Sequence, residues 1–260
     1  IVSGSRVMKL MASDTAVPQQ KPVSGRDISN GRIEFKHVSF SYDGETPILD
    51  DISFVAEPGQ TVALVGETGS GKSSIINVLM RFYEFQSGQV LIDDHDIREY
   101  DYATLRHKMG LVLQEPFLFY GTVASNIRMF DQSISDQQVR AAAEFVNAGE
   151  MIESLPKGYD SKVIERGNGY SSGQKQLISF ARTVVTDPKI LILDEATANI
   201  DTETEQEIQK SLAKLQSGRT TIAIAHRLST IQNADLILVL RQGKIIERGT
   251  NDELMAQKGA

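Results

Sequence analysis

The sequence predicts an α/β fold with a mainly parallel sheet, an N-terminal antiparallel β subdomain and an inserted helical subdomain. Short apolar segments typical of buried strands alternate along the chain with amphipathic helical segments. A glycine-rich loop at 66–73 joins one such strand to a helix. Residues 122–186 show mostly helical periodicity, which predicts a helical subdomain at about 115–186 inserted between strands.

The N-terminal region divides into two segments before this fold begins. Residue 1 is not Met, and residues 1–12 predict the end of a helix that began upstream. One apolar face of that helix would hold Val2, Val7, Leu10 and Met11. Residues 13–31 are polar, include two prolines and predict a linker. We therefore expect the folded domain to occupy 32–260.

The first part of the domain is expected to consist of strands around one helix. Alternating apolar residues predict strands at 32–42 and 48–56, joined by a turn at Asp43-Gly44. A short apolar run that ends in glycine predicts a buried strand at 61–66. A helix at 72–83 and a strand at 88–94 follow.

The second part returns to the sheet after the helical region, in which Ser135 and Ser154 are the expected helix caps. Apolar runs predict buried strands at 189–195 and 220–226, separated by an amphipathic helix at 202–215. Residues 234–249 predict a hairpin that turns at Gln242-Gly243. This hairpin would supply an antiparallel edge to the sheet.

Composition excludes several classes of protein. The formal net charge is −7, whereas nucleic-acid-binding domains usually carry a basic surface. No nucleic-acid partner is therefore expected. The sequence has no cysteine, which excludes disulfides and thiolate metal sites and fits a reducing compartment. No apolar run approaches the roughly 18 residues of a membrane helix.

The loop "GETGSGKS" at 66–73 matches the phosphate-binding pattern G-x-x-x-x-G-K-[ST]. Its glycines allow backbone N–H groups to surround phosphate oxygens at a helix N-terminus. Lys72 would neutralise the β- and γ-phosphates, and the Ser73 hydroxyl would bind Mg²⁺. The alternative is a structural strand-to-helix turn, which the lysine and the flanking elements disfavour.

The segment "ILILDEAT" at 190–197 ends a buried strand with two acidic residues. Ligands of open α/β sheets collect at the carboxyl ends of the strands. Asp194 can therefore hold the Mg²⁺ shell, and Glu195 can polarise the water that attacks the γ-phosphate. The alternative is two solvated acids that open a helix.

Further motifs narrow the type of phosphate-loop enzyme. The N/T-K-x-D tetrapeptide of GTPases is absent from the sequence. "YSSGQKQ", "DEAT", "NID" and "AHR" follow one another from residue 170 to residue 227. In this order they resemble the nucleotide-binding domain of ATP-binding cassette (ABC) transporters, from about Arg32 to Glu253. The resemblance implies the ABC ATPase fold around a phosphate-loop ATPase core.

The resemblance also implies roles for individual residues. Tyr42 would stack on adenine, although it could also be an ordinary strand aromatic beside Phe40. Gln114 would touch Mg²⁺ and the attacking water, and His226 would contact the γ-phosphate. The residues assigned to ATP are Tyr42, Gly66, Glu67, Thr68, Gly69, Ser70, Gly71, Lys72, Ser73, Ser74, Ser171, Ser172, Gly173, Gln174 and Asp201. Mg²⁺ is assigned to Ser73, Gln114 and Asp194, and catalysis to Glu195, His226 and Gln114.

The stretch from Ser171 to Gln174 can be read in two ways. By itself it is a capping box, in which Ser171 and Gln174 bond each other's backbone at the start of a helix. In the family, this helix N-terminus faces ATP held by the phosphate loop of a second ABC subunit, and Asp201 also lies towards that subunit. The resemblance therefore implies that two such domains pair around ATP.

Within the family the exporter type fits best, because 113–127 and 165–167 resemble exporter segments. This resemblance implies a fused membrane domain missing from this fragment, and a position on the cytoplasmic face of the cell membrane. Residues 1–12 would then be the cytoplasmic end of the last transmembrane helix. The usual signature is L-S-G-G-Q, but this chain has Tyr170 and Ser172 in place of its leucine and first glycine. Because Glu195 and His226 are intact, the chain resembles one half of a heterodimeric bacterial multidrug exporter. The alternative is a homodimer in which the substitutions in the signature are tolerated.

Two other functions stay open on the sequence. A soluble ABC-type ATPase of the DNA-repair or translation class would share the core motifs but lack the upstream membrane helix. A regulatory nucleotide-binding module would not need Glu195 and His226, which are both present. The transported substrate cannot be inferred, since the membrane domain would select it.

Overall fold

The computed structural model describes residues 22–113, 115–195 and 202–257, with only the backbone for 202–204. The segment 1–12, Gln114 and Asp201 lie outside the described residues, so their predicted roles stay predictions. Within the described ranges, no helix has the length and apolar character needed to cross a membrane.

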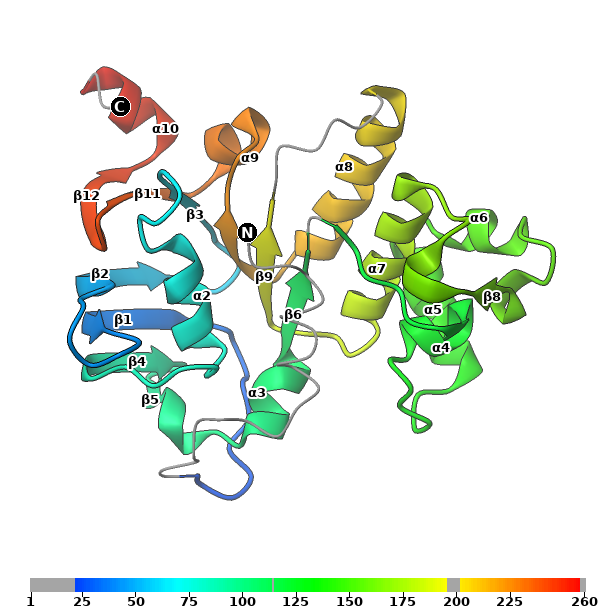
Figure 1. The fold of residues 1–260 in the computed structure, drawn as a ribbon, viewed down its shortest axis with the longest axis horizontal. Coiled ribbons are helices and arrows are strands. Elements are labelled where there is room, and N and C mark those ends of the chain that lie inside the picture. Colours follow the sequence, from blue (N-terminus) through cyan, green and yellow to red (C-terminus); the bar gives the residue numbers. More distant parts are fainter. Residues whose placement is uncertain (1–21, 114, 196–201, 258–260) are drawn as a thin grey trace.

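The central sheet has six strands in the order β12-β11-β3-β10-β9-β6. These are β12 (Lys244–Gly249), β11 (Leu236–Arg241), β3 (Thr61–Val65), β10 (Thr220–Ile224), β9 (Ile190–Asp194) and β6 (Met109–Val112). All neighbouring pairs are parallel except β11 and β12, the predicted hairpin. β6 and β9 run side by side in the same direction (Figure 1). The prediction of a mainly parallel sheet with an antiparallel edge is confirmed.

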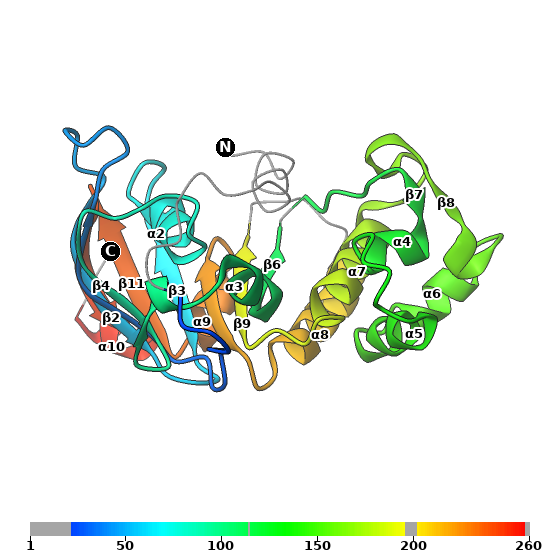
Figure 2. The same ribbon diagram turned by 90° about the horizontal axis from the view of Figure 1, so that it is seen from below.

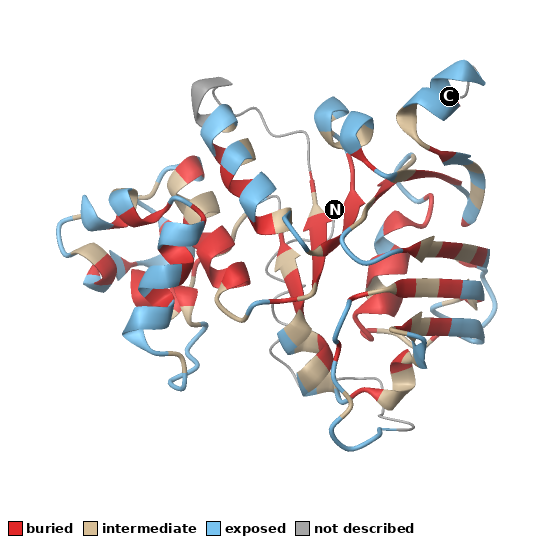
Figure 3. Cartoon of the chain, turned by 180° about the vertical axis from the view of Figure 1, so that it is seen from behind, coloured by how far each residue is buried: buried red, intermediate tan, exposed pale blue. Residues whose placement is uncertain are grey.

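A four-stranded antiparallel sheet in the order β2-β1-β4-β5 forms the second layer. Its strands are β1 (Ile33–Phe40), β2 (Leu49–Ala56), β4 (Ser87–Ile92) and β5 (His95–Asp96). Alternating apolar residues of β1 and β2 point inward, and the rings of Phe35 and Phe54 stack with centroids 4.7 Å apart. This sheet shares one hydrophobic core with the central sheet and α2 (Lys72–Leu79). Buried residues are interspersed with more exposed ones along the strands of this sheet (Figure 3).

The helical subdomain lies to one side of the two sheets (Figure 2). It comprises α4 (Val123–Ile127), α5 (Asp136–Phe145), α6 (Gly149–Glu153) and the short strands β7 (Gly121–Thr122) and β8 (Lys162–Val163). The helices α7 (Ser172–Val184) and α8 (Thr202–Gln216) connect it to the sheet through a second core. The remaining helices are α3 (Tyr102–Lys108), α9 (Leu228–Asn233) and α10 (Asn251–Ala256). Three single-turn 3₁₀ helices occupy Ile97–Glu99, Gly158–Asp160 and Glu165–Gly167.

Two local predictions differ from the structure. The helix expected at 72–83 ends at Leu79, because Arg81 takes the left-handed conformation with φ of 61° and interrupts the helical backbone. Ser135 caps the start of α5 as expected, with its hydroxyl accepting from the Gln138 N–H. Ser154 instead ends α6, and its hydroxyl donates to the Met151 carbonyl.

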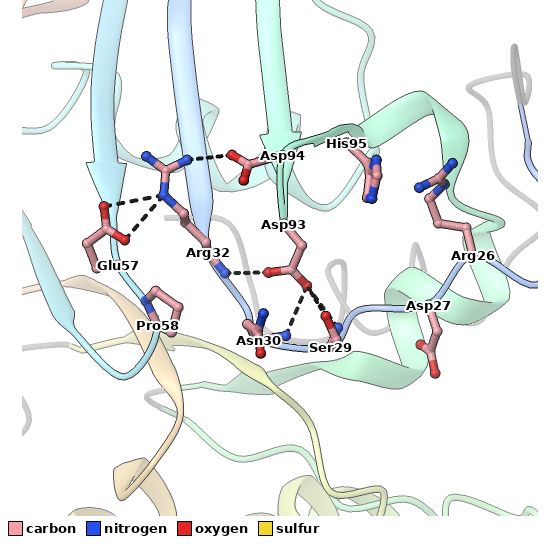
Figure 4. Close-up of a pocket in the computed structure, with 10 residues that line it drawn as sticks. All are labelled: Arg26, Asp27, Ser29, Asn30, Arg32, Glu57, Pro58, Asp93, Asp94 and His95. Atoms are coloured by element: carbon pink, nitrogen blue, oxygen red, sulfur yellow. Dashed lines mark hydrogen bonds and ion pairs between the residues drawn. The ribbon is translucent and has the colours of Figure 1, made fainter.

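The segment 22–31, within the range assigned to the linker, lies against the domain. Ile28 is only 2% exposed and belongs to the main hydrophobic core. The Asp93 carboxylate accepts hydrogen bonds from the backbone N–H groups of four consecutive residues, Ser29, Asn30, Gly31 and Arg32, at 2.8–3.0 Å. Figure 4 shows this carboxylate facing the segment from the end of β4. One side chain therefore fixes the path by which the chain enters the domain.

Candidate nucleotide site

The phosphate loop leaves β3 and enters α2, as its sequence predicts. A Cβ atom on Gly66 would lie 2.5 Å from the Leu240 carbonyl oxygen, and one on Gly71 would lie 2.9 Å from Leu49 Cδ2. Gly71 also has φ of 111°, a conformation that disfavours other residues. The loop backbone is tied to the β11–β12 turn, because the Gly243 N–H donates to the Ser70 carbonyl at 2.9 Å. Glycine is thus required at both ends of the loop by close packing.

The side chains of the loop suit an anionic ligand. Lys72 is 8% exposed, and its Nζ donates to the Gly66 carbonyl at 2.5 Å. Burial lowers the pKa of Lys72, and the Asp194 carboxylate partly offsets this effect. The buried Ser70 hydroxyl has no hydrogen-bond partner among the described residues. A desolvated ammonium and an unpaired hydroxyl within a glycine cradle are satisfied when phosphate oxygens bind.

Glu67, Thr68, Gly69 and Ser73 are exposed around this cradle, whereas Ser74 is buried behind it. The exposed Ser73 hydroxyl is free to face a bound ion, and hydroxyl and carboxylate oxygens are the ligands that Mg²⁺ prefers. Asp194 ends β9 as predicted. Burial raises the pKa of Asp194, the nearby His226 and Lys72 lower it, and Glu195 raises it. The donor set near the loop therefore fits a magnesium nucleotide.

Glu195 is 6% exposed, and both of its carboxylate oxygens are engaged. Oε1 accepts from the backbone N–H groups of His226 and Arg227, at 3.2 and 3.3 Å. Oε2 accepts from the Thr230 hydroxyl at 2.5 Å. The structure therefore brings the predicted Glu195 and His226 together, although through the backbone of His226 rather than its ring.

Thr230 is a contact that sequence reasoning missed. It lies in α9, which begins two residues after the predicted His226, whereas β10 already ends at Ile224. The only available signal was a hydroxyl residue shortly after "AHR". Nothing in local periodicity ties that hydroxyl to an acid 35 positions earlier.

Tyr42 lies beyond the end of β1, so the structure does not place it as a strand aromatic. It is 47% exposed, and its ring packs edge-on against Phe40 and Tyr83 at 4.6 and 4.7 Å between centroids. Its hydroxyl shares a 3.0 Å hydrogen bond with Ser74 and accepts another from Asn77 Nδ2. The ring is thus held beside the phosphate loop by its polar end, a use of the hydroxyl that the sequence did not suggest.

The signature stretch has the geometry of the capping box. The Ser171 hydroxyl accepts from the Gln174 N–H at 3.1 Å, and Gln174 Oε1 accepts from the Ser171 N–H at 2.9 Å. Ser171 and Ser172 are exposed, whereas Gly173 is buried. Tyr170, the residue in place of the usual leucine, donates its hydroxyl to the Lys162 carbonyl at 2.8 Å. The capping box explains why α7 begins here, and it leaves Ser171 and Ser172 exposed to solvent.

A glycine cradle with a buried lysine, near acids at the carboxyl end of a parallel sheet, is typical of a phosphate-loop nucleoside triphosphatase. A family model described as "ABC transporter" matches residues 49–198. The chain belongs to the ABC transporter family, and it is an ATP-binding domain of the ATPase type.

Relatives agree with this assignment. The chain is 61% identical over 259 residues to a Streptococcus pneumoniae protein provisionally named ABC transporter ATP-binding protein exp8, covering 100% of this chain and 44% of that protein. It is 52% identical over 258 residues to the "Probable multidrug resistance ABC transporter ATP-binding/permease protein YheH" of Bacillus subtilis, covering 99% and 38%. The chain thus spans less than half the length of these relatives.

A solved structure titled "Structure of a bacterial Atm1-family ABC exporter with ATP bound" superposes with a TM-score of 0.83 at 40% identity. The match covers 98% of this chain and 45% of that one. The ABC ATPase fold predicted from the sequence is confirmed.

Proposed function

We propose that this domain hydrolyses ATP to power export across a membrane, through ATP-driven pairing with a second ABC subunit. The observation that carries the proposal is the glycine cradle with its buried Lys72, lying near the acids Asp194 and Glu195. The names of the relatives and of the matched structure favour an exporter over a soluble ATPase of the DNA-repair or translation class.

Phosphate binding rests on the loop 66–74. Its backbone N–H groups and the Ser70 hydroxyl surround the phosphates, and Lys72 exchanges its bond with the Gly66 carbonyl for phosphate oxygens. Tyr42 stacks on the adenine with its exposed ring. These interactions bind ATP without reacting with it.

Ser73, Asp194 and Gln114 would hold Mg²⁺, which would neutralise negative charge on the nucleotide phosphates. Glu195 accepts a hydrogen bond from the attacking water and aligns it with the γ-phosphate, and the exposed His226 ring contacts that phosphate. Hydrolysis in this class depends mostly on such positioning.

The relatives' greater length supports a membrane domain fused to this one. Residues 1–12 are the end of the last helix of the membrane domain, and residues 13–31 connect that helix to the ATPase domain. Residues 32–260 form the ATPase domain on the cytoplasmic face. The helical subdomain, about 115–186, belongs to this ATPase domain. No nucleic-acid partner belongs to this function.

In the pair, the stretch from Ser171 to Gln174 of this chain, of which Ser171 and Ser172 are exposed, faces the ATP held by the second subunit, and Asp201 lies towards that subunit. The exposed Ser172 replaces a glycine, which adds a side chain where the backbone must approach phosphate. The natural partner is therefore a different half-transporter, with a regular signature and a replaced catalytic acid. The full-length protein is expected to need co-expression with that partner for robust ATPase activity. Equal activity from the chain alone would refute the heterodimer.

The catalytic assignment is tested with Glu195→Gln and Lys72→Ala in the full-length transporter. Glu195→Gln is expected to abolish most ATP turnover and leave ATP binding nearly unchanged, because the carboxylate acts on the water and not on the phosphate cradle. Lys72→Ala is expected to weaken ATP binding itself. Steady-state ATPase assays and fluorescent-nucleotide titrations measure both. Turnover at the parental rate in Glu195→Gln would refute the role of Glu195.

A further inference from the structure

The hydrogen bonds around Glu195 define a small cluster, formed by Glu195, the N–H groups of His226 and Arg227, and the Thr230 hydroxyl. Two donors reach Oε1 and one reaches Oε2. A carboxylate oxygen has two lone pairs, so the donors from the described part of the chain fill Oε1 and leave Oε2 one acceptor site. Thr230 therefore determines which lone pair of Glu195 remains for a water molecule.

Two of these donors are backbone groups and do not depend on side-chain identity. Among the described residues, the Thr230 hydroxyl is the only side-chain group that donates a hydrogen bond to this carboxylate, and any residue other than proline at 226 or 227 keeps the other two donors. Glu195 also lies next to Asp194, another carboxylate, which repels it. The hydrogen bond from Thr230 to Oε2 offsets this repulsion and fixes the rotation of the carboxylate plane.

The segment that carries the donors is itself anchored. Arg227 forms an ion pair with Glu205 of α8, so the backbone that donates to Oε1 is tied to a second helix. The backbone N–H of Glu195 donates to the Ile224 carbonyl of β10 at 3.1 Å. The carboxylate is thus held between two fixed parts of the fold, and Thr230 is the adjustable contact.

We propose that Thr230 is a positioning residue for ATP hydrolysis, which orients the Glu195 carboxylate so that the remaining lone pair of Oε2 receives the attacking water. This inference rests on the proposed role of Glu195. Thr230 itself touches neither ATP nor the reacting atoms. Its removal lowers the rate of chemistry and leaves the phosphate cradle intact.

The test compares Thr230→Val, Thr230→Ser and Ser229→Ala in the full-length transporter, assembled with its partner. Val keeps the shape of Thr but has no hydroxyl, Ser restores the hydroxyl, and Ser229 is an exposed neighbouring hydroxyl residue. Thr230→Val is expected to lower kcat about tenfold or more, since misplacement of a catalytic group by about 1 Å can cost about a hundredfold. The Kd for ATP and the thermal midpoint are expected to stay within error. Thr230→Ser recovers most of the rate, and Ser229→Ala matches the parent.

A measurement without nucleotide gives an independent readout. Hydrogen exchange at the amides of His226 and Arg227 is expected to be faster in Thr230→Val, because a carboxylate free to rotate protects them less. Thr230→Ser and Ser229→Ala are expected to exchange like the parent. Unchanged exchange in Thr230→Val would overturn the inference.

Glu195→Gln, measured in parallel, separates the inference from the proposed function. If Glu195→Gln keeps parental turnover, the proposed role of Glu195 fails and the inference fails with it. If Glu195→Gln is inactive while Thr230→Val retains or exceeds the parental kcat, only the inference is refuted. If both are slow, adding Thr230→Val to Glu195→Gln is expected to cause no further loss, because both act on one carboxylate.

Discussion

Replacing Asp93 by Asn is expected to loosen the attachment of the segment 22–31 to the domain. The carboxylate accepts four backbone N–H groups and also bonds the Ser29 hydroxyl at 3.3 Å. Asn keeps only one acceptor oxygen and turns an NH₂ group towards donors. Hydrogen bonds to a charged group contribute about 1.5–3 kcal/mol each, but bonds that share one carboxylate do not add. We expect a loss of about 2–3 kcal/mol, or about 4–10 °C in Tm.

The effect of Asp93→Asn depends on pH in a defined direction. Burial by itself would raise the pKa of Asp93, but the four backbone donors outweigh it and lower the pKa. The stabilisation is therefore fully present above the unfolded pKa of about 3.9 and is lost as the pH falls through the folded pKa. The difference in unfolding free energy between parent and variant should be constant near pH 6–7 and shrink below pH 4.

The assay is urea unfolding at several pH values, with limited proteolysis of the segment 22–31 as a local readout. Asp94→Asn is the matched control, because the Asp94 side chain is 75% exposed and forms an ion pair with Arg32. An exposed ion pair contributes about 0–1 kcal/mol. Equal effects of the two variants, or a difference that does not change with pH, would refute the reasoning.

Two further predictions concern the rest of the molecule. Tyr42→Ala should raise the Kd for ATP about tenfold, whereas Tyr42→Phe should keep the stacking ring and lose only the hydrogen bonds to Ser74 and Asn77, as nucleotide titration would measure. Equal losses from both variants would contradict stacking. Arg182→Met should cost about 3–5 kcal/mol in urea unfolding, because the buried guanidinium holds the carbonyls of Phe117 and Asn126 and the Asn126 side chain. Burial lowers the pKa of Arg182 to about 10, so it is still charged at neutral pH. A loss below about 1 kcal/mol would show that these carbonyls are not held by Arg182.

The sequence by itself determined those features that depend only on residues close together in the chain. The phosphate loop, the acidic pair after a buried strand and the capping box at Ser171 each occupy a few successive residues, and local backbone geometry follows from residue types at fixed spacing. Buried parallel strands are also readable, since their residues are apolar on both faces. The early end of α2 could not be predicted from the sequence. Helical periodicity continues past Leu79, and it does not indicate that Arg81 adopts a left-handed conformation.

Only the tertiary structure decided the contacts between distant segments. The order of strands in the sheet places β9 beside β10, which brings Thr230 and the N–H groups of His226 and Arg227 to Glu195. The same kind of packing brings Asp93 to residues more than 60 positions earlier. Hydrophobic periodicity reports which face of a strand is buried but not which strand lies next to it. The partners of a side chain at a strand end are therefore set by topology, which local sequence does not encode.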